Sequence, residues 1–172
     1  MYFEKFPRIQ YTNVEGGPSR TVVNILRRIG ARDAVKTNGV LFSKYSIMGS
    51  ETPESVAFDF YGDAELHWVL LLVNDIYDRY HEWPMNVNQF QAFLADRYDD
   101  PNGVHHYEIS QSSGDTNLTI NIGDDNTDYP TATLITNFEY EEKEQDRKRQ
   151  IKILSTSFLP QFIKEYENLQ SN

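Results

Sequence analysis

The chain has 172 residues, which fits one domain or one compact core with extensions. It contains no cysteine, so disulfides, thiolate nucleophiles and cysteine-based zinc or iron–sulfur sites are excluded. Its formal net charge of −10 argues against bulk binding of nucleic acid, because phosphate contacts need clustered cations.

The first 18 residues predict an extended arm. This segment carries apolar side chains that follow no steady period: Phe3, Phe6, Ile9 and Tyr11. It lacks the charged flank and long apolar run of a secretory signal, so we expect a soluble protein made in the cytoplasm. Because its apolar groups need cover, the arm is a candidate for docking on a partner protein. The alternative is that it folds back and seals its own core.

A helix is expected after the arm, capped by Ser19 or Thr21 and running through Arg28. This part of the chain is basic: residues 1–48 hold 8 bases and 3 acids, a net charge of +5, whereas residues 49–172 hold 8 bases and 23 acids, a net charge of −15. The asymmetry indicates either docking on an acidic surface or ordinary neutralisation within the molecule.

The middle of the chain predicts a strand followed by two helices. Val40–Met48 is rich in residues that favour strands. Thr52 suits a helix cap, Pro53 suits the first helical turn, and Gly62 suits the end of that helix.

The second of these helices is expected to begin at an Asp63 cap and to run to about Val73. It is apolar on nearly every side, which is typical of a buried helix. Asn74 suits a left-handed stop, and Ile76 and Tyr77 then begin a short extended return. The whole passage therefore predicts a β-α-α-β unit.

The remaining elements alternate between helix and strand. A helix is expected at 84–99 and a β-hairpin from Val104–Ser110 and Asn117–Ile122, followed by a polar loop. A charged helix, a strand and a final helix follow: Phe138–Arg147, Gln150–Leu154 and roughly 157–169. The strand either completes the sheet of the β-α-α-β unit or offers an edge for pairing.

The stretch MGSETPESVAFDFYGDAELHWVLLLVNDI resembles the LysM pattern, in the form found in phage tail and baseplate proteins. Its specific part is the YGD-x-x-L-x-W-V-L-L run, in which we expect Trp68 and Leu70 to be buried. More widely, FYGDAELHWVLLLVNDIYDRYHEW, the early FEKFPRIQY and the late KRQIKILSTSFLPQFIKEYE resemble the baseplate wedge protein fifty-three family of T-even-like phages. These matches frame nearly the whole chain.

Taken with this resemblance, the elements predict an α+β protein. An N-terminal arm and helix at 1–35 precede a LysM-like core with its following helix at 36–100. A β-hairpin and polar loop at 101–137 and a C-terminal helix-strand-helix at 138–172 complete the expected organisation.

The resemblance also implies a function. It implies a structural protein of the virion tail baseplate that clamps neighbouring wedge proteins and helps wedges close around the hub. The partners would be other wedge proteins, with several copies of the chain in a six-fold assembly and no nucleic acid or membrane. Two alternatives are a peptidoglycan-binding LysM-type module and a tail-associated cell-wall hydrolase.

Several polar groups have residue types that occur in metal or catalytic sites. His105 and His106 lie in an expected strand, where adjacent side chains point to opposite faces, so one zinc ion cannot readily take both. The acidic turn Asp124–Asp128 imitates a calcium loop, but Tyr129 and Ile135 stand where an EF-hand needs Gly and Glu. No phosphate loop, GxSxG or HExxH motif is present. We therefore expect no catalytic, metal or cofactor site.

Two further groups of residues are interface candidates beside the arm. The first follows the apolar helix and mixes aromatic with charged side chains, which suits a protein interface, although Tyr77 and Trp83 could instead cap the core. Its members are Tyr77, Asp78, Tyr80 and Trp83. The second belongs to the late strand, whose edge could pair with a partner: Gln150, Ile151, Lys152 and Ile153.

Overall fold

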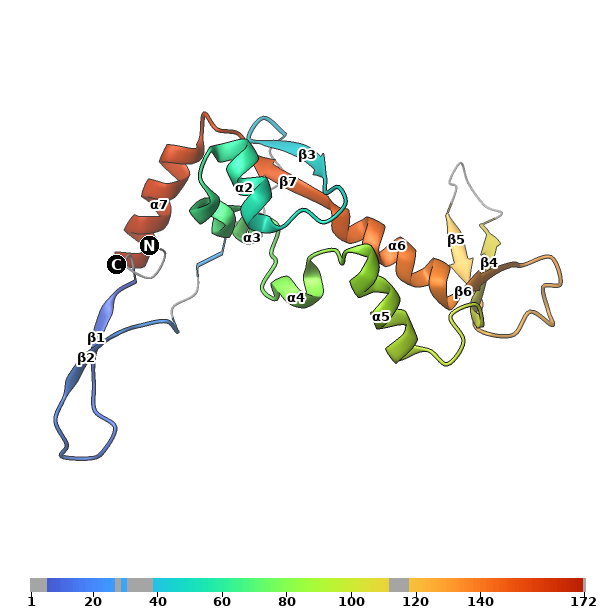
Figure 1. Ribbon diagram of the computed structural model, residues 1–172, viewed down its shortest axis with the longest axis horizontal. Coiled ribbons are helices and arrows are strands. Elements are labelled where there is room, and N and C mark those ends of the chain that lie inside the picture. Colours follow the sequence, from blue (N-terminus) through green and yellow to red (C-terminus); the bar gives the residue numbers. More distant parts are fainter. Residues whose placement is uncertain (1–5, 27–28, 31–38, 112–117, 172) are drawn as a thin grey trace. The chain divides into compact units, whose positions relative to one another are not determined.

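The computed structural model describes residues 6–26, 29–30, 39–111 and 118–171, and its contacts group into two compact units (Figure 1). The first unit draws its described residues from 1–46, 51–82 and 151–172. The second draws them from 47–50 and 83–150. Each unit thus combines stretches that are far apart in the sequence, and each is described by itself below.

The described elements of the first unit are, in chain order, β1 (Arg8–Tyr11), β2 (Arg20–Val23), β3 (Phe42–Ser46), α2 (Pro53–Tyr61), the 3-10 turn η2 (Ala64–Leu66), α3 (His67–Val73), α4 (Arg79–Glu82), β7 (Gln150–Leu154) and α7 (Leu159–Ser171). Those of the second unit are α5 (Val87–Arg97), β4 (Val104–Ser110), β5 (Thr119–Asn121), β6 (Thr133–Thr136) and α6 (Asn137–Arg149). Gln150, the first residue of β7, groups with the second unit. The chain is therefore α+β, as predicted.

The helices of the first unit begin and end where local side chains satisfy the backbone. Thr52 caps α2 by accepting a hydrogen bond from the backbone amide of Ser55 at 3.2 Å, and the backbone amide of Thr52 donates to the Ser55 hydroxyl at 2.9 Å. Gly62 ends α2 with a positive φ of 73°, a conformation that glycine adopts without steric cost. Asp63 then caps η2, which leads into α3. The predicted two-helix passage is confirmed.

Strands β3 and β7 form a two-stranded sheet from residues about a hundred positions apart. At one end the amide of Ser155 donates to the carbonyl of Leu41 at 2.8 Å, and at the other the amide of Ile47 donates to the carbonyl of Arg149 at 2.9 Å. This order of contacts makes the pair antiparallel. The late strand therefore pairs with β3, which is the first of the two arrangements expected for it.

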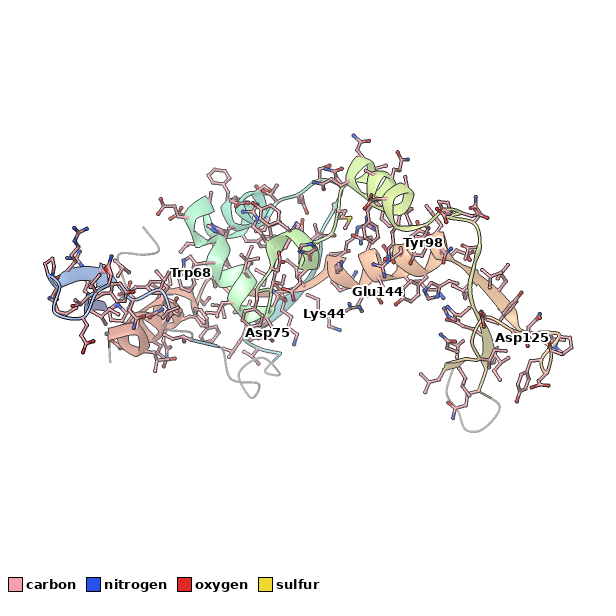
Figure 2. The ribbon with its side chains drawn as sticks, turned by 90° about the horizontal axis from the view of Figure 1, so that it is seen from below. Lys44, Trp68, Asp75, Tyr98, Asp125 and Glu144 are labelled. Carbon is pink, nitrogen blue, oxygen red and sulfur yellow. The ribbon has the colours of Figure 1, made fainter. Side chains whose placement is uncertain are left out.

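The core of this unit is formed where α3, β7 and the start of α7 meet. Its buried members are Val69, Val73, Leu154 and Leu159. The Trp68 ring extends the core toward α7, with its centroid 4.5 Å from that of Tyr166 and 6.4 Å from that of Phe162 (Figure 2). Leu70 is fully buried, as predicted, whereas Trp68 is only partly buried.

Two predicted elements of this unit are wrong. Arg20–Val23 is a strand and not the start of a helix, because it pairs antiparallel with β1 along all four residues and its β-branched side chains favour that state. Ile76 and Tyr77 form no strand, so the β-α-α-β order is completed by β7 instead. The left-handed residue after α3 is Asp75, with φ of 56°, and not Asn74. The LysM-like character of the core stays a prediction.

The second unit joins a three-stranded antiparallel sheet, in the order β5-β4-β6, to helices α5 and α6. The sequence predicted the β4–β5 hairpin and α6 but missed β6, which lies in the segment read as a polar loop. Buried side chains of this unit include Ile47, Trp83, Leu94 and Ile135. Among the described residues, no helix of either unit is long and apolar enough to cross a membrane.

Candidate protein-interaction sites

The β1–β2 hairpin carries two of the four residues predicted in the arm, Ile9 and Tyr11, and both are exposed, at 40% and 55% of their surface. Ile9 lies directly opposite Val22, and Tyr11 lies opposite Arg20. Because side chains alternate along a strand, these four residues share one face of the hairpin. We call it the Ile9 face.

The other two arm residues differ. Phe6 is buried, with 8% of its surface exposed, so this part of the arm seals the chain's own core. Phe3 lies outside the described residues. Within the arm, Phe6 therefore packs inward, whereas the strand that follows it is exposed.

The aromatic cluster after α3 is divided by the fold. Tyr77 and Tyr80 are strongly exposed, at 71% and 82%, and belong to the first unit. Trp83 is buried in the second unit, with only 7% exposed, so its role there is packing.

Asp78 immediately precedes the short helix α4. One of its carboxylate oxygens lies 2.6 Å from Nδ1 of His81, and the other accepts the amide of Tyr80 at 2.9 Å. These hydrogen bonds, from His81 first and Tyr80 second, lower the pKa of Asp78. The backbone amides of Tyr77 and Asp78 in turn donate to the Glu82 carboxylate. Asp78 therefore shapes the turn that presents Tyr77 and Tyr80.

In β7 the four candidates alternate as a half-buried strand should. Ile151 and Ile153 are buried at 4% and 2%, whereas Gln150 and Lys152 are exposed. In the ladder with β3, backbone groups of alternate residues point away from the partner strand, and Lys152 is one of these.

The outward backbone amide and carbonyl of Lys152 are hydrogen-bonded to the side chain of Asn74. The side-chain nitrogen Nδ2 of Asn74 donates to the backbone carbonyls of Lys152 and Leu70, each at 2.8 Å. The backbone amide of Lys152 donates to Asn74 Oδ1 at 2.8 Å. The Asn74 side chain thus connects the end of α3 to β7, at the edge of β7 that faces away from β3 (Figure 2 labels the neighbouring Asp75). Pairing of a partner strand at that edge would have to displace it.

The two adjacent histidines of β4 come together, against the sequence-based expectation. Their Nδ1 atoms lie 2.7 Å apart, because the register shifts between Val104 and His106 and this bulge turns the side chains away from strict alternation. His106 Nε2 lies 3.1 Å from the Glu108 carboxylate, and the His105 ring stacks on Tyr140 of α6 with centroids 3.9 Å apart. The pair joins the sheet to α6.

Burial lowers the pKa of His105, and the neighbouring His106 adds to the effect. Burial alone would raise the pKa of Glu108, but hydrogen bonds and charge from His106 and Lys143 outweigh it and the pKa is lowered. Nearby, the Tyr98 hydroxyl donates to buried Glu141 at 2.8 Å (Figure 2 labels Tyr98). This cluster holds α5, α6 and the sheet together by polar contacts.

No set of metal ligands emerges in the described part of the chain, where no three His, Asp or Glu side chains are grouped to hold an ion. In the acidic turn, Asp125 accepts hydrogen bonds from the amide and hydroxyl of Thr127, which lowers the pKa of Asp125. Its carboxylate shapes the loop between β5 and β6.

Comparison with known proteins gives a consistent result. The family model described as base plate wedge protein 53 matches residues 1–169. The chain is also similar to the baseplate wedge protein gp53 of Enterobacteria phage T4, with 26% identity over 183 residues that cover 96% of this chain and 93% of that protein. Since the match runs through both compact units, the chain belongs to the base plate wedge protein 53 family and is a structural component of a phage tail baseplate.

Proposed function

We propose that the chain clamps neighbouring proteins of the baseplate wedge and helps wedges close around the hub, and that the β1–β2 hairpin is one arm of the clamp. The observation that carries this proposal is the exposure of every residue in both strands of the hairpin.

A two-stranded hairpin is marginally stable in water unless other structure covers it. Here the Ile9 face presents Ile9, Tyr11 and Val22 to solvent, with exposures of 40%, 55% and 36%. Both outer edges of the hairpin also carry strand backbone that a partner strand can extend. A partner that covers this face would bury apolar surface and stabilise the hairpin at the same time.

Charge favours an acidic partner. The hairpin carries Arg8 and Arg20, and residues 1–48 have a net charge of +5 in a chain of net charge −10. Opposite charge on a partner would speed association and fix its orientation. A clamp also needs a second contact surface, and the second compact unit can supply that surface.

The test is reconstitution of wedges from the purified tail proteins of the same phage, followed by sedimentation. The variant Ile9→Thr/Val22→Thr removes apolar surface from an opposed pair while keeping β-branched side chains that favour strands. Its melting temperature should stay near that of the wild type, and its incorporation into wedges should fall. Point variants are preferable to deletion of residues 2–12, because deletion would also remove the buried Phe6.

The matched control is Val23→Thr, which makes the same kind of change on the opposite face of the same strand. It should enter wedges normally. Normal incorporation of the double variant would contradict the role of the hairpin. A pull-down on peptidoglycan with the same proteins tests the glycan-binding alternative, which would require retention on the cell-wall polymer.

A further inference from the structure

The three-stranded sheet of the second unit has two unlike faces. In the antiparallel register Glu108 lies opposite Asn121 and Thr133, and His106 lies opposite Ile135. These residues share one face, because directly opposed residues point the same way. His106 and Glu108 contact Tyr140 and Lys143 of α6, and His106 and Ile135 are buried. Helix α6 of the same chain therefore covers part of this face.

The opposite face is apolar and bare. Ile109 lies opposite Ile120, and Tyr107 lies opposite Leu134. Ile120 and Leu134 expose 47% and 42% of their surface, and Tyr107 and Ile109 are partly exposed. We call these four residues the Tyr107 face.

The pattern along the strand extends this face. The amide of Gln111 donates to the carbonyl of Leu118 at 2.8 Å, so the ladder continues one residue beyond β5. Leu118, which is 61% exposed, therefore lies on the same face as Ile120, whereas the polar Thr119 and Asn121 lie on the opposite face. An isolated apolar side chain on a surface needs no explanation, but a contiguous set on one sheet face is typical of a contact site.

The charge around this face has one sign. Residues 118–136, which form β5, β6 and the loop between them, contain three acidic residues and no lysine or arginine. Asp124, Asp125 and Asp128 belong to the loop that joins β5 to β6, and Figure 2 shows Asp125 in that loop beside the sheet. Any surface that docks here must therefore meet an apolar centre next to an acidic loop.

We propose that the Tyr107 face is a docking site for another baseplate protein, one that presents an apolar patch framed by lysine and arginine side chains. Aromatic and aliphatic groups at the centre supply burial, and the acidic loop selects a basic partner. The proposal rests on the baseplate role of the chain but not on the hairpin. It gives a function to the segment in which the sequence suggested none.

The contact is tested by photo-crosslinking in assembled baseplates that contain the full chain. A benzophenone amino acid is placed at Ile120 or Leu134 and, as matched controls, at Asn121 or Thr133, which are exposed neighbours on the opposite face. Crosslinks to a different polypeptide should form from the first two positions and not from the controls. Mass spectrometry should place them within a surface rich in lysine and arginine.

Affinity is tested with Ile120→Thr/Leu134→Thr, which removes apolar surface and places a β-branched residue, favourable in strands, at both positions. Its melting temperature should match that of the wild type, and its incorporation should fall about tenfold, equivalent to about 1.4 kcal/mol. Incorporation of the wild type should also weaken between about 0.1 and 1 M salt, over which the screening length shrinks from about 10 to about 3 Å.

Crosslinks to this chain or to a second copy of it, or unchanged incorporation of the folded variant, would overturn the proposal. If the variant unfolds, crosslinking alone decides. If the hairpin variants are incorporated poorly but the sheet variants are incorporated normally, the clamp proposal stands and the proposal of this docking site is rejected. Absence of the wild-type chain from baseplates would instead remove the assignment on which both proposals rest.

Discussion

The first unit contains two antiparallel strand pairs that differ in their cover. In β3–β7, Ile151 and Ile153 are buried and the Asn74 side chain occupies backbone groups on the free edge of β7. In β1–β2, every residue is exposed. The hydrogen-bonded ladder is of the same kind in both pairs, so it does not explain the difference.

The comparison indicates that apolar cover, and not the backbone ladder, distinguishes the two strand pairs. A pair packed against helices gains burial and serves as scaffold, whereas a bare pair retains apolar surface for a partner. Substitutions in the covered pair should therefore change the stability of the isolated chain. Substitutions in the bare pair should change assembly.

The largest effect within the first unit is expected from Leu70→Ala. Leu70 is fully buried in α3, and its truncation should lower the free energy of unfolding by about 2–5 kcal/mol through lost burial and a cavity. Denaturant titration measures this. The control Ile9→Ala, on the bare hairpin, should change the same quantity by only about 0.5 kcal/mol. Equal effects at the two positions would break the comparison.

A smaller loss is expected from Asn74→Ala. The substitution leaves the outward amide and carbonyl of Lys152 without the Asn74 side chain, which should cost about 1–3 kcal/mol. Asn24→Ala is the matched control, because the Asn24 side chain makes a local bond to the Leu26 amide. If both variants unfold at the same denaturant concentration as the wild type, Asn74 does not hold β7.

Acid should weaken the covered face of the second sheet. Burial lowers the pKa of His105 from 6.5, so the unfolded chain binds that proton more readily than the folded chain. The groups around His105 include His106, Glu141, Arg97 and Tyr140. Stability from this site is therefore present above the unfolded pKa and is lost as the pH falls through it.

The depressed pKa of Glu108 acts in the same direction at lower pH, since its contribution is present above 4.5 and is lost as that carboxylate is protonated. Melting temperature should be measured from pH 7.5 to 4. The variant His105→Gln should flatten the upper part of the profile. A profile that keeps its slope in His105→Gln would rule out this group as the cause.

The smallest effect on stability is expected from Tyr80→Ala, because 82% of that side chain is exposed. The free energy of unfolding should change by about 0.5 kcal/mol at most. Its buried neighbour in sequence, Trp83, gives the contrast, and Trp83→Ala should cost about 3–5 kcal/mol. If folded Tyr80→Ala enters wedges poorly, the exposed tyrosines are part of an interface; if it enters normally, they are not.

Local chemistry made much of the chain predictable. Thr52, Gly62 and Asp63 act within a few residues of themselves, so the helices that they bound could be identified from the sequence. The apolar Leu70 was placed correctly for the same reason, since the period of a helix sets its faces. Among the interface candidates, only exposure separates Tyr77 and Tyr80 from Trp83, and exposure depends on the rest of the fold.

The sequence by itself determined the helix caps, the buried face of α3 and the resemblance to the wedge family, because these depend on neighbouring residues and on a specific motif. Only the tertiary structure decided that β7 pairs with β3, that Arg20–Val23 is a strand, and that a bulge joins His105 to His106. Strand pairing takes its energy from a partner that can lie anywhere in the chain, so no local pattern contains it.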